Sequence, residues 1–186
     1  MNHKTLIILS ILLCLCGCIT EVWTGASLLY DRHHVYKKMG DYSLSARVNH
    51  LLFSDNVFKC RGCVIDVATF NDDVLLAGHV PTERLHAMLA GRLAHLSEYR
   101  HLYNEVVVAR IPSQTVTDTW ITTKIRSHLL ADSRLDPNAF KVITTDGIVY
   151  LMGEVMADQA RRVVYIAQNT AGVRKVVKLM HYFTIK

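Results

Sequence analysis

Residues 140–155 read FKVITTDGIVYLMGEV, and this stretch decides the fold. Two runs rich in branched and aromatic residues flank Asp146 and Gly147, and Asp-Gly between two such runs is a strong indication of a β-hairpin. Residues 157–170 follow with apolar positions at helical spacing, and residues 176–185 form a further strand-like run. The stretch and its continuation therefore predict an order of strand, strand, helix and strand.

The segment before the hairpin, residues 118–130, predicts an amphipathic helix. Apolar residues recur every four positions from Ile121 to Leu129, and we expect Leu130 to widen this buried face. Asp118 is of a residue type that caps helix N-termini, so we expect it to be the N-cap. The second half of the chain is thus predicted as helix, strand, strand, helix and strand.

The first half of the chain predicts the same order. It comprises an expected helix at 44–52, strands at 64–70 and 74–80, a second helix at 82–96 and a strand at 102–111. Matching positions, such as Gly78 and Gly153, are separated by a near-constant 74 to 77 residues. Two copies of one supersecondary unit indicate two small α+β domains, which we place at 43–112 and 113–186.

The N-terminus predicts export and lipidation. A positive start, a short apolar run and a small residue before a cysteine identify residues 1–17 as a secretory signal peptide. Leu15 and Gly17 resemble a bacterial lipobox, in which the following Cys18 accepts diacylglycerol through its thiolate and becomes the lipid-anchored first residue. The residue after this cysteine is not Asp, which by the lipoprotein sorting rule indicates the outer membrane. Residues 18–42 show little periodicity and are expected to be a lipidated tether.

Two further cysteines, Cys60 and Cys63, form a CxxC pair. In an oxidising compartment they either form a small local disulfide or remain two thiols. A redox pair would open a helix directly after a strand, whereas this pair precedes a strand-like run. Two thiols alone do not complete a zinc site, and the adjacent His33 and His34 lie in a polar stretch that is expected to be solvated. We expect no metal and no cofactor.

Positive charge is concentrated in the second half of the chain. Residues 116–186 hold ten Lys or Arg against six Asp or Glu, whereas residues 18–115 hold ten of each kind. An excess of positive charge favours anionic partners. Because export argues against nucleic acid, an anionic membrane is the better prediction.

Trp120 is the residue on which the functional prediction depends. It lies one position off the buried row of residues 118–130, with Lys124 one turn on and Arg126 and His128 also outside that row. An indole ring and cations at an exposed helix edge suit the boundary between hydrocarbon and anionic headgroups. The alternative is that Trp120 is a partly buried core residue.

Two copies of this unit behind a lipobox resemble the paired BON domains of bacterial lipid-binding lipoproteins. The resemblance is densest at residues 118–124, 149–153 and 183–186. It implies that each domain has a small mixed sheet packed against two helices. It also implies a non-enzymatic outer-membrane lipoprotein, facing the periplasm, that binds anionic phospholipid through its second domain and supports envelope integrity and cell division.

The same resemblance implies where the membrane contact lies. The first helix of the second domain would place Trp120 in the inserted edge, and Thr123, Lys124 and Ser127 would be flanking contacts. The matching helix of the first domain has no tryptophan, so lipid binding is not transferred to it.

Motifs typical of enzymes are not present in the sequence. It contains no HExxH, no Gly-x-Ser-x-Gly and no glycine-rich phosphate loop. The competing hypothesis is a protein-interaction adaptor for an outer-membrane assembly, for division proteins or for a peptidoglycan-associated complex. Such an adaptor would present a large exposed apolar patch away from the Trp120 helix.

Overall fold

The computed structural model describes residues 27–184, with side chains from residue 39 onward. Tyr36 to the end of the chain forms one compact unit. The elements are α2 (Ser27–Phe53), β1 (Val64–Phe70), β2 (Asp73–Val80), α3 (Glu83–Leu93), β3 (His101–Val108), α4 (Thr115–Ala131), the 3-10 helix η1 (Pro137–Ala139), β4 (Phe140–Thr145), β5 (Ile148–Val155), α5 (Ala157–Gln168) and β6 (Lys175–Tyr182).

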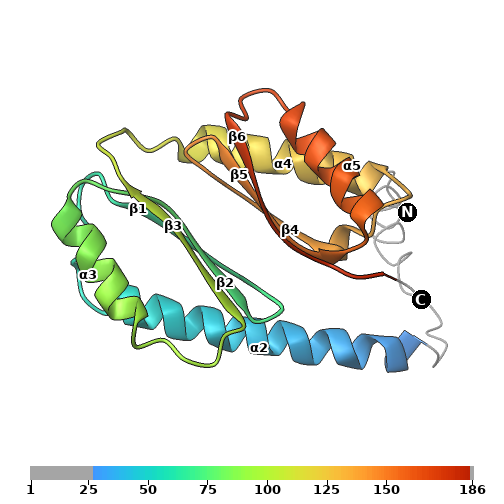
Figure 1. Ribbon diagram of the computed structural model, residues 1–186, viewed down its shortest axis with the longest axis horizontal. Coiled ribbons are helices and arrows are strands. Elements are labelled where there is room, and N and C mark those ends of the chain that lie inside the picture. Colours follow the sequence, from blue (N-terminus) through green and yellow to red (C-terminus); the bar gives the residue numbers. More distant parts are fainter. Residues whose placement is uncertain (1–26, 185–186) are drawn as a thin grey trace, which may run out of the picture. The chain divides into compact units, whose positions relative to one another are not determined.

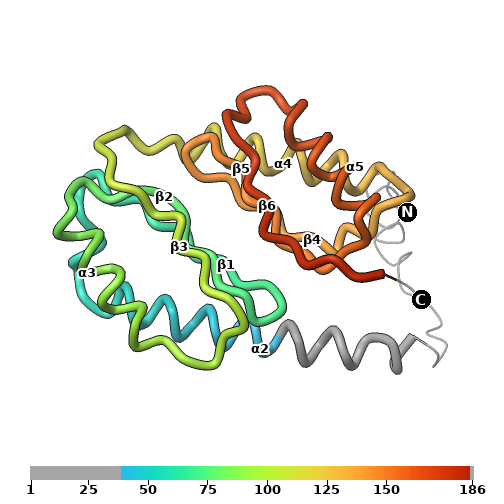
Figure 2. Tube along the Cα trace, in the orientation of Figure 1, coloured from blue at the N-terminus to red at the C-terminus, as the bar shows by residue number. Residues whose placement is uncertain are grey.

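Each half of the chain builds a three-stranded mixed sheet, which confirms the α+β class. The strand orders are β1-β2-β3 and β4-β5-β6, and in each sheet the central strand pairs antiparallel with the first strand and parallel with the third. A helix makes each parallel crossover, as parallel strands require. Figure 2 traces this path twice, first in green and then in orange and red. We call the two halves the first and second repeat.

Both helices of a repeat cover one face of its sheet (Figure 1). In the second repeat, Ile121, Ile125 and Leu129 of α4 pack with inward residues of β4 and β5 into one core cluster. In the first, Leu44 and Val48 of α2 occupy the corresponding cluster. The four-residue spacing in the sequence therefore predicted the buried rows of α2 and α4 correctly.

The other faces of the two sheets pack against each other. Leu75 and Ala77 of β2 form a third cluster with Tyr150 and Met152 of β5. Because β2 and β5 are covered on both faces, they are almost continuously apolar rather than alternating. Burial in this layer raises the pKa of Tyr150 to about 12.

Polar contacts also join the repeats around this apolar layer. His79 Nδ1 lies 2.7 Å from Asp146 Oδ2, and both side chains are buried. The ammonium of Lys141 on β4 donates to the carbonyl of Thr69 on β1 at 2.8 Å. The two repeats thus share a mixed apolar and polar interface.

Asp118 has a different role from the one predicted. The helix α4 begins three residues earlier, at Thr115, and its N-cap is Gln114, so the N-cap prediction for Asp118 was wrong. The Asp118 carboxylate is buried and accepts hydrogen bonds from the backbone amides of Asp146 and Gly147, both at 2.8 Å. It fixes the β4–β5 turn to α4.

The first helix of the first repeat begins earlier than expected. The expected tether of residues 18–42 ended before the first helix, whereas α2 runs from Ser27 to Phe53 without interruption. The segment contains no proline to stop it, and its single glycine is tolerated inside a helix at modest cost. The predicted signal peptide at 1–17 and the lipid anchor at Cys18 lie outside the described residues.

Cys60 and Cys63 are joined by a disulfide in the loop between α2 and β1, with their Cα atoms 5.3 Å apart. The bond closes a loop of only a few residues before the first strand. Across residues 27–184, no helix is both long and apolar enough to cross a membrane.

Candidate functional site

The side of α4 that faces away from the core carries a line of exposed residues. They follow one another at spacings of four, three, four and three, which keeps them on one side of a helix. We call this set the outer line of α4: Val116, Trp120, Thr123, Ser127 and Leu130. The line presents apolar groups at both ends and next to its centre.

Exposure along the outer line is high for apolar residues. Val116 is 86% exposed, Trp120 48% and Leu130 71%. The prediction that Leu130 widens the buried face was therefore wrong. Each residue advances roughly 100° around a helix, so Leu130 lies well around from Leu129 and faces outward.

Trp120 and Lys124 form one contact at the edge of this line. The Lys124 ammonium lies 5.7 Å from the centroid of the indole ring, within cation–π range. About half of the Trp120 side chain remains accessible. The indole is thus held at the surface with a positive charge beside it, rather than enclosed in the core.

Three hydroxyl groups along α4 donate hydrogen bonds to backbone carbonyls of the same helix. Thr119, Thr123 and Ser127 each donate to the backbone carbonyl four residues earlier, at 2.7, 2.8 and 2.9 Å respectively. Because their hydroxyl hydrogens are already engaged, these residues can enter a less polar layer at lower cost. Their oxygen atoms still have lone pairs for partners that donate.

A pocket of about 370 Å3 lies beside α4, between that helix, β4 and β1. Its lining includes Thr123 of the outer line and two cations, Arg126 and Lys141. Burial lowers the pKa of Lys141, while burial raises the pKa of Asp66 across the pocket. Asp118 lines the pocket as well, so its two cations face two carboxylates and the pocket carries no excess of positive charge.

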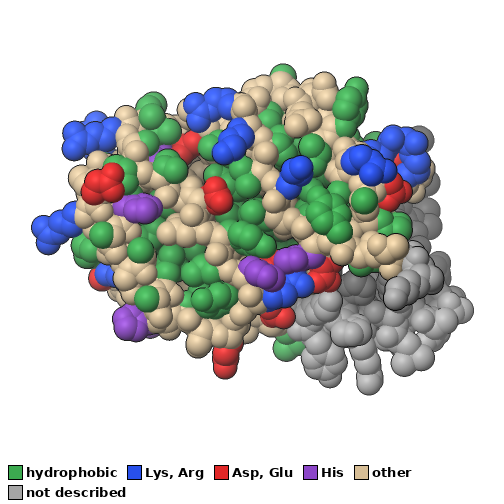
Figure 3. Space-filling view, in the orientation of Figure 1, with side chains coloured by type: hydrophobic (Ala, Val, Ile, Leu, Met, Phe, Trp, Pro, Cys, Tyr) green, Lys and Arg blue, Asp and Glu red, His purple; other side chains and the backbone are tan. Residues whose placement is uncertain are grey.

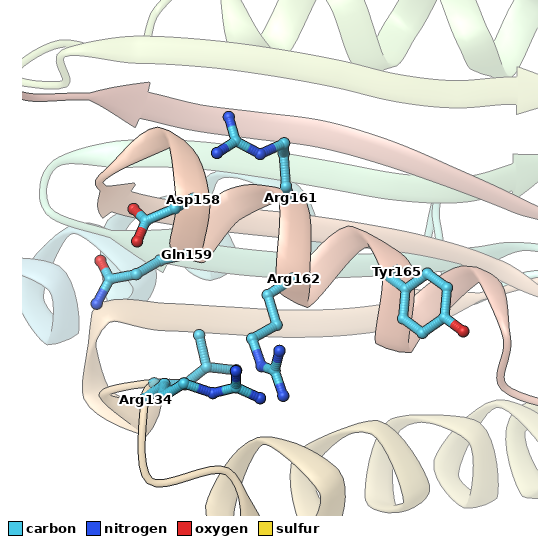
Figure 4. Close-up of a pocket in the computed structure, with 7 residues that line it drawn as sticks. Arg134, Asp158, Gln159, Arg161, Arg162 and Tyr165 are labelled. Atoms are coloured by element: carbon cyan, nitrogen blue, oxygen red, sulfur yellow. The ribbon is translucent and has the colours of Figure 1, made fainter.

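A second group of cations lines a pocket between α5 and the loop after α4. Figure 4 shows Arg134 and Arg162 turned toward the same side, with Arg161 directed away from them. Asp132 forms ion pairs with both Arg134 and Arg162. Because one carboxylate already partners both guanidinium groups, this pocket is a weaker anion site than the surface of α4.

The structure brings the four predicted contact residues together on one helix. Trp120, Thr123 and Ser127 lie in the outer line, and Lys124 flanks it. Sequence reasoning missed Val116 and Leu130, although their spacing from Trp120 follows the helical period and could have revealed them. It also missed Lys141, whose position beside α4 depends on strand pairing.

Positive side chains are spread over the surface of the second repeat. Figure 3 shows Lys and Arg side chains in blue, scattered among hydrophobic ones over the upper part of the view, where this repeat lies. Lys and Arg side chains are also visible at the left of this view, over the first repeat.

Comparisons with known proteins agree on one family. The BON domain model matches residues 117–182, which comprise most of the second repeat. The outer membrane lipoprotein DolP of Haemophilus influenzae is 30% identical, over 96% of this chain and 95% of its own length. A 21 kDa hemolysin of Actinobacillus pleuropneumoniae is 34% identical, over 78% of this chain and 75% of its own.

Among solved structures, CdsD of the Chlamydia trachomatis type III secretion system is 23% identical. Its TM-score is 0.33, and the match covers 78% of this chain and 65% of that one. Neither of the two relatives described above is named as an enzyme. The extent of the match to DolP, together with the BON domain in the second repeat, shows that this chain belongs to the DolP family of outer-membrane lipoproteins.

Proposed function

We propose that this lipoprotein binds anionic phospholipid through the outer line of α4 and thereby supports envelope integrity and cell division. The observation that carries the proposal is the half-exposed Trp120 with Lys124 at its ring, between the exposed Val116 and Leu130. Apolar groups that enter the acyl boundary, with cations at headgroup level, are typical of interfacial helices. The protein would be anchored by Cys18 and would face the periplasm.

The interaction is expected to be weak on its own. Each cation near an anionic surface contributes about 1 kcal/mol, and inserting an indole contributes about 2 kcal/mol. A lipid anchor at Cys18 would hold α4 close to the bilayer, so that a weak second contact has a high effective concentration. Under this proposal the anchor supplies residence on the membrane, and α4 supplies orientation and preference for anionic lipid.

The first repeat, which we propose is a second BON domain, has a different surface. Counted by the separation of 77 residues between matching helix positions, Trp120 corresponds to Ser43 and Thr123 to Ala46. Both are exposed, and neither provides an aromatic group for insertion. An exposed aromatic residue of α2, Tyr42, matches Thr119 rather than Trp120, so we assign lipid binding to the second repeat.

The test compares two exposed aromatic residues of the second repeat. Residues 19–186, without the lipid anchor, are mixed with vesicles of phosphatidylglycerol and phosphatidylcholine, and the bound fraction is measured by co-sedimentation. Trp120→Ala should abolish binding, while Tyr165→Ala on α5, a residue 68% exposed, should leave it unchanged. Far-UV circular dichroism should show the same fold for all three proteins.

Salt and lipid charge provide the second arm of this test. Binding should fall as salt rises, because surface charge is screened over about 8 Å at physiological ionic strength. It should vanish on pure phosphatidylcholine, because this lipid carries no net charge. Equal binding by the wild type and Trp120→Ala would reject the proposal. Absence of vesicle binding by the wild type would also reject it and would favour the adaptor hypothesis, for which exposed groups such as Tyr182 and Phe183 are candidate contacts.

A further inference from the structure

We propose that Asp73, His101 and His181 form a binding site for a divalent transition-metal ion of the zinc type, with ligands from both repeats. This site lies outside the outer line of α4 and does not depend on lipid binding. Asp73 begins β2, His101 lies beside it in register on β3, and His181 lies on β6 of the second repeat. These strands are brought together by the packing of the two sheets.

The three side chains already converge on one point. His101 Nδ1 lies 3.0 Å from one carboxylate oxygen of Asp73, and His181 Nε2 lies 2.7 Å from the other. The candidate ligand atoms all lie within 4.8 Å of one another, and the two imidazole ring centroids are 4.8 Å apart. No other such group of three is found among the described residues.

The donor set has the chemistry of a zinc-type site. Two imidazole nitrogens and one carboxylate oxygen are common ligands of Zn²⁺, with an open fourth position for water. A tetrahedral ion needs ligand atoms roughly 3.4 Å apart. The two histidine nitrogens lie 3.0 and 2.7 Å from the Asp73 oxygens, so the rings must move slightly away from Asp73 and exchange these hydrogen bonds for bonds to the ion. They have room to do so, because the side chains of His101 and His181 are 50% and 32% exposed.

Arg100 holds the carboxylate for this role rather than blocking it. Its guanidinium donates to both oxygens of Asp73, at 2.8 and 2.9 Å, and also pairs with Glu154. Each carboxylate oxygen has two lone-pair positions, so one on each remains for the side of the histidines.

A bound ion would tie the repeats together. Two of its ligands come from the first repeat and one from the second, so the site is complete only in the packed chain. An ion that binds only the folded state raises the unfolding temperature. Metal binding should therefore stabilise the interface between the two sheets.

The experiment uses the full chain, purified in detergent without an affinity tag and stripped with a chelator. ZnCl2 is added, and binding is followed by calorimetry and by the shift in unfolding temperature. One ion should bind per chain with an upward shift. His101→Asn and His181→Asn should each weaken binding by at least about tenfold, the scale typical of damaged metal sites.

Matched variants separate this site from other histidines. His95→Asn removes an exposed histidine of the first repeat, and the double change at His33 and His34 removes the adjacent pair. Both should keep the affinity of the wild type. Circular dichroism of the metal-free proteins shows whether each variant is folded. Asp73→Asn is a third variant that removes a proposed ligand.

Two outcomes would overturn the proposal. One is the absence of saturable zinc binding to the folded wild type. The other is binding that survives in folded His181→Asn or that disappears in the His33 and His34 variant. Because neither readout involves vesicles, failure here would leave the lipid proposal untouched.

Discussion

Two aspartates at matching positions each hold a hairpin turn. Asp118 accepts from the amides of Asp146 and Gly147, and Asp41 accepts from those of Asn71 and Asp72 at 2.9 and 3.0 Å. The two aspartates are separated by the same 77 residues as the matching helix positions. The same contact therefore occurs in both repeats, where it fixes the first helix to the hairpin turn.

Removing the carboxylate should lower the free energy of unfolding by different amounts at the two positions. Asp118 is buried, whereas Asp41 is only half-buried. Leaving a buried donor unsatisfied costs about 1–3 kcal/mol, so Asp118→Ala should lower the free energy of unfolding by about 2–4 kcal/mol. Asp41→Ala should cost less, because water reaches the freed amides. Urea denaturation measures both, and a larger loss at Asp41 would contradict the argument.

Sequence reasoning singled out Asp118 but gave it the wrong partner. A residue type favoured at helix starts, directly before a periodic run, predicts an N-cap. Its true partners are amides 28 and 29 residues further along the chain. Local preference cannot identify such a partner, although the matching Asp41 in the other copy was a sign that the position has a role of its own.

At the scale of elements, the turn after each second helix uses left-handed backbone. Gly172 has a φ of +88° before β6, and Glu98 has a φ of +60° before β3. The two positions are 74 residues apart, which is the separation of the matching strands. A residue with a side chain is strained in this conformation by about 1–2 kcal/mol, whereas glycine is not.

Replacing Glu98 by glycine should therefore stabilise the first repeat. The change relieves the strained backbone and loses only an exposed ion pair with Arg47, which contributes little. We expect a gain of about 0.5–1 kcal/mol in the free energy of unfolding, part of the relief being offset by the greater freedom of glycine in the unfolded chain. Thermal and urea unfolding measure this, with Glu83→Gly in the first turn of α3 as a control that should destabilise. A loss of stability in Glu98→Gly would show that Arg47 matters more than the backbone.

Hairpins were predicted well, and helix ends were not. The Asp146 and Gly147 turn is a local feature, so β4 and β5 could be found from sequence alone. The start of α2 at Ser27 could not, because that segment lacks an apolar period. In the candidate site, the exposed position of Trp120 followed from its place off the buried row. Leu130 was placed on the wrong face because it follows Leu129 directly, and two adjacent leucines do not show which of them continues the helical period.

At the scale of the whole molecule, the sequence suggested two domains but not their shared interface. Leu75 and Tyr150 meet across the two sheets, and Asp73 meets His181. Burial raises the pKa of Asp73, but hydrogen bonds from Arg100, His101 and His181 outweigh it and hold the pKa below its usual value. These contacts join residues up to 108 positions apart, and no local pattern encodes them.

Because the repeats share this interface, they should unfold together. Leu76 is fully buried in the first repeat and faces its own helices, so Leu76→Ala should cost about 2–5 kcal/mol. In a Trp23→Phe background the only tryptophan is Trp120, in the second repeat. The urea midpoint reported by Trp120 fluorescence should fall in Leu76→Ala and should coincide with that from circular dichroism. Independent domains would instead leave the fluorescence midpoint unmoved, because a cavity in the first repeat lowers the stability of the second only through the packed sheets.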